Sequence, residues 1–189
     1  MLVSAYKQYV KKGGPGTLEQ YATSPSQEHR VPLFDSRFFE YHRLVGYYQD
    51  LFGAENVLVL PYELLSTKPL TFLERIGGFA GTRASPSALE PVKVSPSALS
   101  LSFMRRANRW VVRSDLNPAP PFEAEGADWA LLRLCYKADA RMPTKLRVLS
   151  ERRLRAIAEE LVDGRYAKSN AATTVLAGFD LEAFGYACE

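Results

Sequence analysis

The sequence predicts an α/β fold in which helices predominate and one clear strand spans residues 57–60. This strand is the run Val57-Leu58-Val59-Leu60, which is apolar throughout. A strand with one face in water alternates apolar and polar residues, so an unbroken apolar run is typical of a strand covered on both faces. Pro61 ends the run because proline has no N–H to give to a neighbouring strand. No second run of comparable strength occurs in the 189 residues, so we expect the sheet partners to be missing from this chain.

The clearest helix of the sequence precedes this strand. Asp35 or Ser36 caps it, and it runs to Phe52, with Gly53 after it. Apolar and aromatic residues recur in it every three or four positions, and we expect this stripe to lie in the core: Phe38, Tyr41, Leu44, Val45, Tyr48, Leu51 and Phe52. His42 lies on the flank of the stripe, where a structural role is favoured over a catalytic one.

A second helix follows the strand. Pro69 fits its first turn, the apolar residues that follow to Phe79 have helical spacing, and Gly81 can end it. Between strand and helix stand Tyr62 and Glu63, just beyond the carboxyl end of the strand, which is where open α/β sheets bind their ligands. The sequence therefore reads as strand, ligand-binding turn and helix.

The N-terminal helix is predicted over residues 2–12. Its apolar side chains share one face, and Gly13 and Gly14 end it. Ser4 lies in the first turn, where its hydroxyl and the free backbone N–H groups are suited to holding an anion such as a phosphate. A capping or solvated serine is the simpler alternative at that position.

The helix predicted over residues 99–112 carries a basic face formed by Arg105, Arg106, Arg109 and Arg113. A solvated face is favoured there over a contact with an anion or a nucleic acid. Apolar side chains are expected to point inward, namely Leu99, Phe103, Ala107 and either Trp110 or Val111. Packing therefore explains Trp110 better than stacking on a nucleobase.

The remaining segments read as helices and loops. Thr17 and Gln20 have capping-box spacing, which predicts a short helix over residues 17–21. Further helices are expected over 127–140, 150–162 and 165–176, with a final turn over 180–186. Loops are expected over 24–32, 82–96 and 117–121.

Composition limits the class of protein. The chain is 47% hydrophobic, with a net charge of +3 and two cysteines. This composition favours a globular fold, is compatible with an anionic ligand and lacks the strong basic balance of a nucleic-acid-binding protein. We find no metal-ligand spacing, glycine-rich phosphate loop or apolar run long enough to span a membrane. We expect a soluble, cytoplasmic protein and leave open a membrane anchor upstream of Met1.

Three stretches together resemble the C-terminal two-thirds of a sulfotransferase of the bacterial and Golgi-like kind. Residues 2–14, LVSAYKQYVKKGG, resemble the Ser-x-Tyr helix that follows the arginine and proline of the family's 3′-phosphate motif. Residues 47–81, YYQDLFGAENVLVLPYELLSTKPLTFLERIGGFAG, resemble its segment of helix, Phe-Gly, apolar strand, Tyr-Glu, helix and Phe-x-Gly. Residues 166–186, YAKSNAATTVLAGFDLEAFGY, resemble its Ser-Asn and Gly-Tyr tail. The order and the spacing make the resemblance fairly specific.

The resemblance implies a P-loop-like parallel sheet with flanking helices in the full family fold. It implies that residues 1–189 are the C-terminal part of one sulfotransferase domain, without the N-terminal part that binds the phosphosulfate. The implied donor is 3′-phosphoadenosine 5′-phosphosulfate, whose sulfuryl group passes to a hydroxyl or amine acceptor. The Arg-Lys-Gly motif of the small-molecule branch is not visible, which argues against that branch and leaves the acceptor open, with carbohydrate mildly favoured.

The resemblance also implies roles for three residues. Ser4 would donate to the 3′-phosphate, Tyr62 would lie near the adenine or the ribose, and Ser95 would touch the nucleotide. Val94-Ser95-Pro96 departs from the expected asparagine-serine pattern, which puts the role of Ser95 in doubt. No catalytic residue and no metal ligand is assigned, and we expect the chain to be inactive alone because it lacks the 5′-phosphosulfate loop.

Two other classes remain open. A non-catalytic helical interaction module would use the Arg105 face and the tyrosine-rich helix. A nucleic-acid-binding protein is less favoured, and its binding would weaken steeply with salt.

Overall fold

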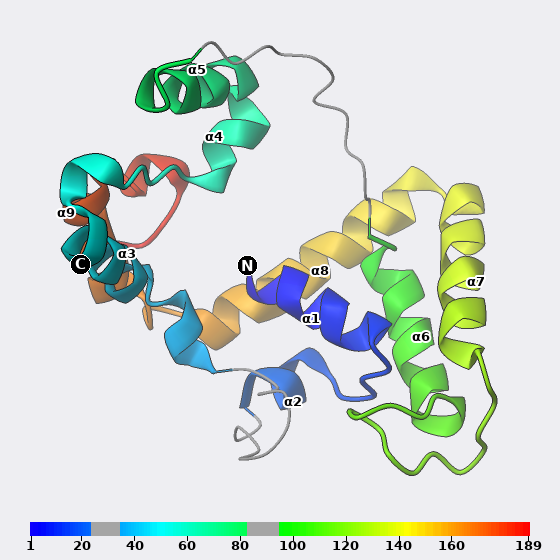
Figure 1. Cartoon of the computed structure of the whole chain (residues 1–189). Coiled ribbons are helices and arrows are strands. Elements are labelled where there is room, and N and C mark those ends of the chain that lie inside the picture. Colours follow the sequence, from blue (N-terminus) through cyan, green and yellow to red (C-terminus); the bar gives the residue numbers. More distant parts are fainter. Residues whose placement is uncertain (24–34, 83–94) are drawn as a thin grey trace. The chain divides into compact units, whose positions relative to one another are not determined.

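The chain divides into two compact units. The computed structural model describes residues 1–23, 35–82 and 95–189. Unit 1 comprises Met1–Asp35 and Lys93–Val162, and unit 2 comprises Ser36–Val92 and Asp163–Glu189. Each unit is thus assembled from two stretches that are distant in the sequence, as the colours of Figure 1 make plain.

The predicted α/β fold, with its parallel sheet and its strand over 57–60, is wrong. Residues 57–60 carry no strand, and the one β-bridge among the described residues joins Ser114 and Asn117. Val57 has an extended backbone, with φ −123° and ψ 106°, but no described segment pairs with the run that it opens. Leu58 is 37% exposed, so the run is not covered on both faces either. An apolar run marks a preference for burial, whereas a strand also needs a neighbour for its N–H and C=O groups.

Unit 1 is a helical assembly in which α6 is central. Its helices, within the described residues, are α1 (Leu2–Lys11), α2 (Leu18–Thr23), α6 (Ala98–Val111), α7 (Ala127–Arg141) and α8 (Thr144–Val162). Helix α6 contacts α1, α7 and α8, and Figure 1 shows it between α1 and α7. The buried side chains come from every one of these helices and include Val10, Leu18, Leu101, Cys135 and Ala158.

Helices α1 and α2 form as the sequence predicts. Leu2, Tyr6 and Val10 recur every four residues and are all buried, so one apolar face of α1 enters the core. The capping box is confirmed, because the Thr17 N–H donates to Gln20 Oε1 at 2.9 Å and the Gln20 N–H donates to Thr17 Oγ1 at 3.2 Å. The loops expected over 24–32 and over most of 82–96, with His29, lie outside the described residues.

The helices described in unit 2 are at most 12 residues long. Within the described residues these are η1 (Ser36–Phe39), α3 (Tyr41–Phe52), η2 (Ala54–Asn56), α4 (Tyr62–Thr67), α5 (Pro69–Phe79), α9 (Ala167–Ala177) and η3 (Glu182–Phe184). Helix α3 packs on α9, and α4 packs on α5. The predicted helix that ends at Phe52 is split, since a 3₁₀ turn ends at Phe39 and α3 begins at Tyr41.

The apolar stripe of α3 does not form a core. Of the seven stripe residues only Val45 is buried, while Leu44, Tyr48, Leu51 and Phe52 are 43–58% exposed. His42 is accounted for structurally, since its Nδ1 lies 2.8 Å from the Oγ of buried Ser169 on α9. Gln49 Nε2 also donates to the Leu176 carbonyl at 2.9 Å, so polar contacts contribute to the α3–α9 packing.

Candidate anion-binding site

The amino end of α6 is fixed by a carboxylate from α7. Asp139 Oδ2 accepts from the Ser97 N–H at 2.6 Å, and Asp139 Oδ1 accepts from the hydroxyls of Ser97 and Ser100 at 2.6 and 2.7 Å. The Ser97 hydroxyl in turn accepts from the Ser100 N–H and caps the helix. Burial opposes ionisation of Asp139, but these hydrogen bonds outweigh it and lower the pKa of the carboxyl below its ordinary value.

The carboxyl half of α6 is fixed to the turn that follows α1. Asn108 is fully buried, and its Nδ2 donates to the carbonyls of Val10 and Gly14 at 2.8 and 3.1 Å. Gly13 has φ +93°, and a Cβ there would lie 2.7 Å from Ser114 Oγ, so both the backbone and the space require glycine. This clamp sets the position of α6 against the turn.

Two tyrosines of α1 hold the far side of the same turn. Tyr9 Oη accepts from the Gly16 N–H at 2.8 Å, and the Tyr6 hydroxyl donates to the Gly16 carbonyl at 3.2 Å. Burial raises the pKa of Tyr6 to about 12, although Arg105 acts in the opposite direction. Both phenols stay neutral at physiological pH, so they hold the turn through hydrogen bonds and contribute no charge to it.

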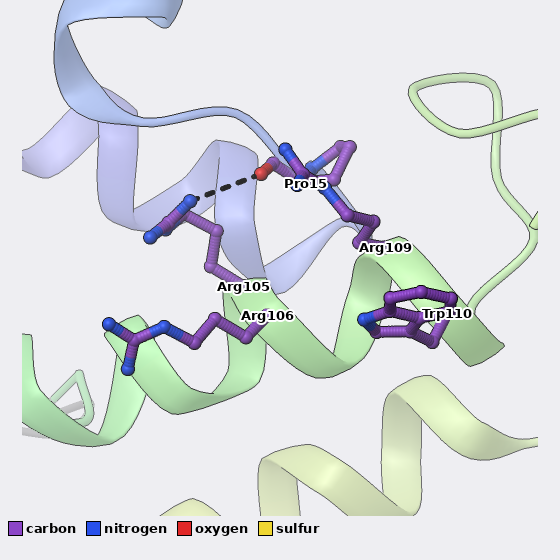
Figure 2. Close-up of a pocket in the computed structure, with 5 residues that line it drawn as sticks. All are labelled: Pro15, Arg105, Arg106, Arg109 and Trp110. Carbon is purple, nitrogen blue, oxygen red and sulfur yellow. Dashed lines mark hydrogen bonds between the residues drawn. The ribbon is translucent and has the colours of Figure 1, made fainter.

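Where α6 meets this turn, the structure forms an open pocket of about 290 Å³. It is lined by Pro15, Arg105, Arg106, Arg109 and Trp110, which Figure 2 draws as sticks. Arg105 Nη1 donates to the Pro15 carbonyl at 3.4 Å, the dashed line in Figure 2. The Arg105 and Arg109 side chains extend toward Pro15 and the turn, whereas the Arg106 side chain points away from Trp110 (Figure 2).

This pocket is strongly cationic. Within the described part of the chain, no carboxylate lies within ion-pair distance of Arg105, Arg106 or Arg109. By contrast, Arg113 one turn further on pairs with Glu123 at 3.0 Å. Positive charge therefore remains uncompensated at the pocket, which suits an anionic ligand.

The inward face predicted for α6 is wrong at Leu99, Phe103 and Trp110, while Ala107 and Val111 are half-buried. Leu99, Phe103 and Trp110 are 45–55% exposed, and the buried face is formed by Ser100, Leu101, Met104 and Asn108. Hydrogen bonds decide which face is buried. Ser100 donates to Asp139 and Asn108 donates to the carbonyl of Val10 at the end of α1, and both bonds require these polar residues to face the core. Trp110 consequently lines the pocket instead of packing in the core.

Two of the three predicted site residues belong to unit 1. Ser4 is exposed in the first turn of α1, and its hydroxyl makes no hydrogen bond within the described residues. Ser95 lies beside the next turns of the same helix, because Lys11 Nζ donates to Ser95 Oγ at 3.3 Å and Lys7 Nζ lies 3.5 Å from the Pro96 carbonyl. Residues 4, 7 and 11 share one face of a helix, so Ser4 and Ser95 border the same stripe of α1.

Tyr62, the third predicted site residue, belongs to unit 2. It opens α4 and is 72% exposed. Its neighbour Glu63 accepts from the Tyr186 hydroxyl through Oε1 at 2.9 Å, and burial together with this carboxylate raises the pKa of Tyr186. Glu63 Oε2 is buried without a hydrogen-bond partner in the described structure. A carboxylate already bound to a phenol on one side is a poor candidate for a catalytic base.

Sequence reasoning found the arginines of the pocket but assigned them to solvent. The available signal was the spacing of residues 105, 106, 109 and 110, which places three arginines and a tryptophan on one helical face. The part played by Pro15 had no signal, because a contact over ninety residues of sequence is set by the packing of α1 on α6.

Other kinds of site have no support in the described ranges. No group of three or more His, Cys, Asp and Glu side chains in residues 1–23, 35–82 and 95–189 is arranged to bind a metal ion. None of the helices formed by these residues has the length and apolar character needed to cross a bilayer. Comparisons with protein-family models, with curated proteins and with solved structures found no match.

Proposed function

We propose that this chain provides part of the donor-nucleotide site of a sulfotransferase and binds the 3′-phosphate end of 3′-phosphoadenosine 5′-phosphosulfate through Ser4. One observation carries the proposal. In the Ser-x-Tyr motif Ser4 is exposed, with a hydroxyl that makes no hydrogen bond to the residues that the structure describes, whereas Tyr6, two residues on, is only 6% exposed. The motif thus separates a residue available to a ligand from a residue that anchors the helix.

The charge around Ser4 supports this assignment. Lys7 and Lys11 follow it on the same face of α1, and the first turn of the helix contains no acidic residue. The charge of Lys7 is compensated by Glu151 Oε1 at 2.7 Å, so it is Lys11, which donates to the neutral Ser95 hydroxyl, that offers positive charge to an anion. A helix N-terminus with free N–H groups and a hydroxyl suits a phosphate.

The proposed chemistry of the complete enzyme is in-line transfer of the sulfuryl group to an acceptor hydroxyl or amine, with carbohydrate the favoured acceptor. No residue of this chain is assigned as the general base. The role proposed for residues 1–189 is therefore binding of the nucleotide, without turnover by this chain alone.

The test is calorimetric titration at low salt with two ligands, adenosine 3′,5′-bisphosphate and adenosine 5′-monophosphate. We expect the bisphosphate to bind at least tenfold more tightly, because a hydrogen bond to a charged group contributes about 1.5–3 kcal/mol, which is a factor of roughly 10 to 150. Ser4→Ala should reduce that difference, since it removes the hydroxyl and leaves only the backbone N–H groups to bind the 3′-phosphate.

The matched control is Gln8→Ala, an exposed polar residue on the same helix. It should leave the preference for the bisphosphate unchanged. Equal affinity for the two ligands in the unsubstituted chain, or an equal loss in the Ser4 and Gln8 variants, would refute the proposed role of Ser4.

The exposed stripe of α3 favours a second function, a helical interaction module. Leu44, Leu51 and Phe52 leave large apolar side chains in water, which is typical of surfaces that bind other proteins. This function predicts that the chain fails the nucleotide test but associates with a protein partner through unit 2.

A further inference from the structure

The pocket beside Pro15 has features that packing does not explain. Arg106, Arg109 and Trp110 lie on the exposed side of α6, away from the buried Met104 and Asn108, and Arg105 lies at the edge of the buried face, one turn after Leu101. The indole of Trp110 is 52% exposed, so it contributes little to the core of unit 1. A large aromatic side chain that lines a cavity and remains half in water is available to a ligand.

The arginines are arranged at a cost to the helix. Arg105 and Arg109 are four positions apart, and like charges at that spacing destabilise a helix. No carboxylate of the described residues relieves them, although Glu123 relieves nearby Arg113. A bound anion would remove this repulsion.

The two kinds of group define the ligand. A guanidinium presents a planar fork of N–H donors that matches the oxygens of a phosphate. An indole binds a nucleobase by stacking, whichever the base, because every base has a π-face. Inorganic phosphate would leave the indole without a partner, and an uncharged aromatic would leave the arginines without one.

We propose that the pocket formed by Pro15, Arg105, Arg106, Arg109 and Trp110 binds a nucleotide unit, with its base on Trp110 and its phosphate between the guanidinium groups. This site is separate from the one proposed at Ser4 and does not depend on it. The nucleotide has two possible sources, a free mononucleotide and a residue within a single-stranded nucleic acid.

The chain itself supplies a reporter. Trp129, the other tryptophan, is exposed on α7 and does not line the pocket, so Trp129→Phe leaves Trp110 as the sole tryptophan. Fluorescence of this protein is titrated at low salt with adenosine 5′-monophosphate, adenosine, inorganic phosphate and a short oligothymidylate. Stacking of a base should quench Trp110, and the monophosphate should bind at least tenfold more tightly than adenosine.

Matched arginine variants test the charge. Arg109→Gln in the same Trp129→Phe background should lower the affinity for the monophosphate at least fivefold. Arg133→Gln removes an exposed arginine of α7 and should change that affinity less than twofold. An oligothymidylate that binds more tightly than the monophosphate, with a slope near −2 in log affinity against log salt for three arginines, identifies a nucleic acid as the source. A monophosphate that binds as tightly as the oligomer identifies a free nucleotide.

Three outcomes would overturn the proposal. They are the absence of quenching by both the monophosphate and the oligothymidylate, equal losses in the Arg109 and Arg133 variants, and loss of quenching on Ser4→Ala. The last result would move the nucleotide to the start of α1 and leave the sulfotransferase proposal standing. Circular dichroism of each variant shows whether the helices persist.

Discussion

Asp139 acts on two elements with a single side chain. Its carboxylate accepts three hydrogen bonds from residues 97 and 100, at distances of 2.6–2.7 Å, and so ties the start of α6 to the end of α7. Cys135, one turn earlier on α7, is buried and donates to the Ser100 carbonyl at 3.3 Å. The contacts of α7 with the amino end of α6 are therefore largely polar.

Asp139→Asn should lower the free energy of unfolding by about 1–3 kcal/mol at neutral pH, because an amide cannot replace a charged acceptor of three donors. The pKa of Asp139 is lowered by folding, so its contribution is present above the unfolded value, about 3.9, and is lost as the pH falls through the folded value. Urea unfolding at neutral pH and near pH 3 should show the two proteins converging in acid. Asp128→Asn, an exposed change in the same helix, is the control, and an equal effect there would contradict this role.

Tyr6 should make the stability of unit 1 depend on pH at the alkaline end. Burial raises its pKa to about 12, against about 10 in an unfolded chain. A raised pKa gives a contribution that is complete below the unfolded value and is lost as the pH rises through the folded value, so unit 1 should weaken between about pH 10 and 12. Tyr6→Phe should reduce this alkaline loss, as followed by near-ultraviolet absorbance and circular dichroism. An unchanged alkaline profile would show that other groups are responsible.

For a single helix, the sequence predicts where the helix begins and ends better than which of its faces is buried. The helices found as α1, α2, α5, α6 and α7 were all predicted near their observed bounds. The face of α6 was not, because its sequence offers two apolar stripes and the buried one contains Ser100 and Asn108. A polar residue enters a core where distant groups satisfy it, and spacing carries no information about those groups.

Substitutions at two adjacent residues of α6 test which face of the helix is buried. Met104 is fully buried and Phe103 is 55% exposed. Met104→Ala should therefore cost about 2–5 kcal/mol of unfolding free energy, whereas Phe103→Ala should cost less than about 1 kcal/mol. Thermal and urea unfolding of both variants give the comparison. A larger loss for Phe103 would restore the face expected from the sequence.

At the scale of the whole molecule, the sequence indicated no division into units. Hydrophobic periodicity is local, whereas unit 1 joins residues before 36 to residues after 92. The candidate sites follow the same rule: a local motif can be found in the sequence, but a contact between distant segments cannot. Ser4 could be found because its motif is short, but the pocket of α6 needs Pro15, which reaches it only through the packing of α1.

Each unit has its own buried residues, so the effect of a core substitution should stay within one unit. Leu101→Ala should lower hydrogen-exchange protection in α1 and α6, while the amides of α9 in unit 2 keep theirs. Exchange followed by mass spectrometry resolves the two sets of peptides. An equal loss of protection in α9 would show that the units unfold as one.

The interleaved order of the units also has a consequence for synthesis on the ribosome. Lys11 ends α1 and Val111 ends α6, so 100 residues separate the ends of two helices that pack together. At about 5–20 residues per second, α1 waits roughly 5–20 s for α6 to be translated. During that interval the apolar face formed by Leu2, Tyr6 and Val10 has no α6 to cover it. A nascent chain that stalls before α6 should therefore present this face to chaperones.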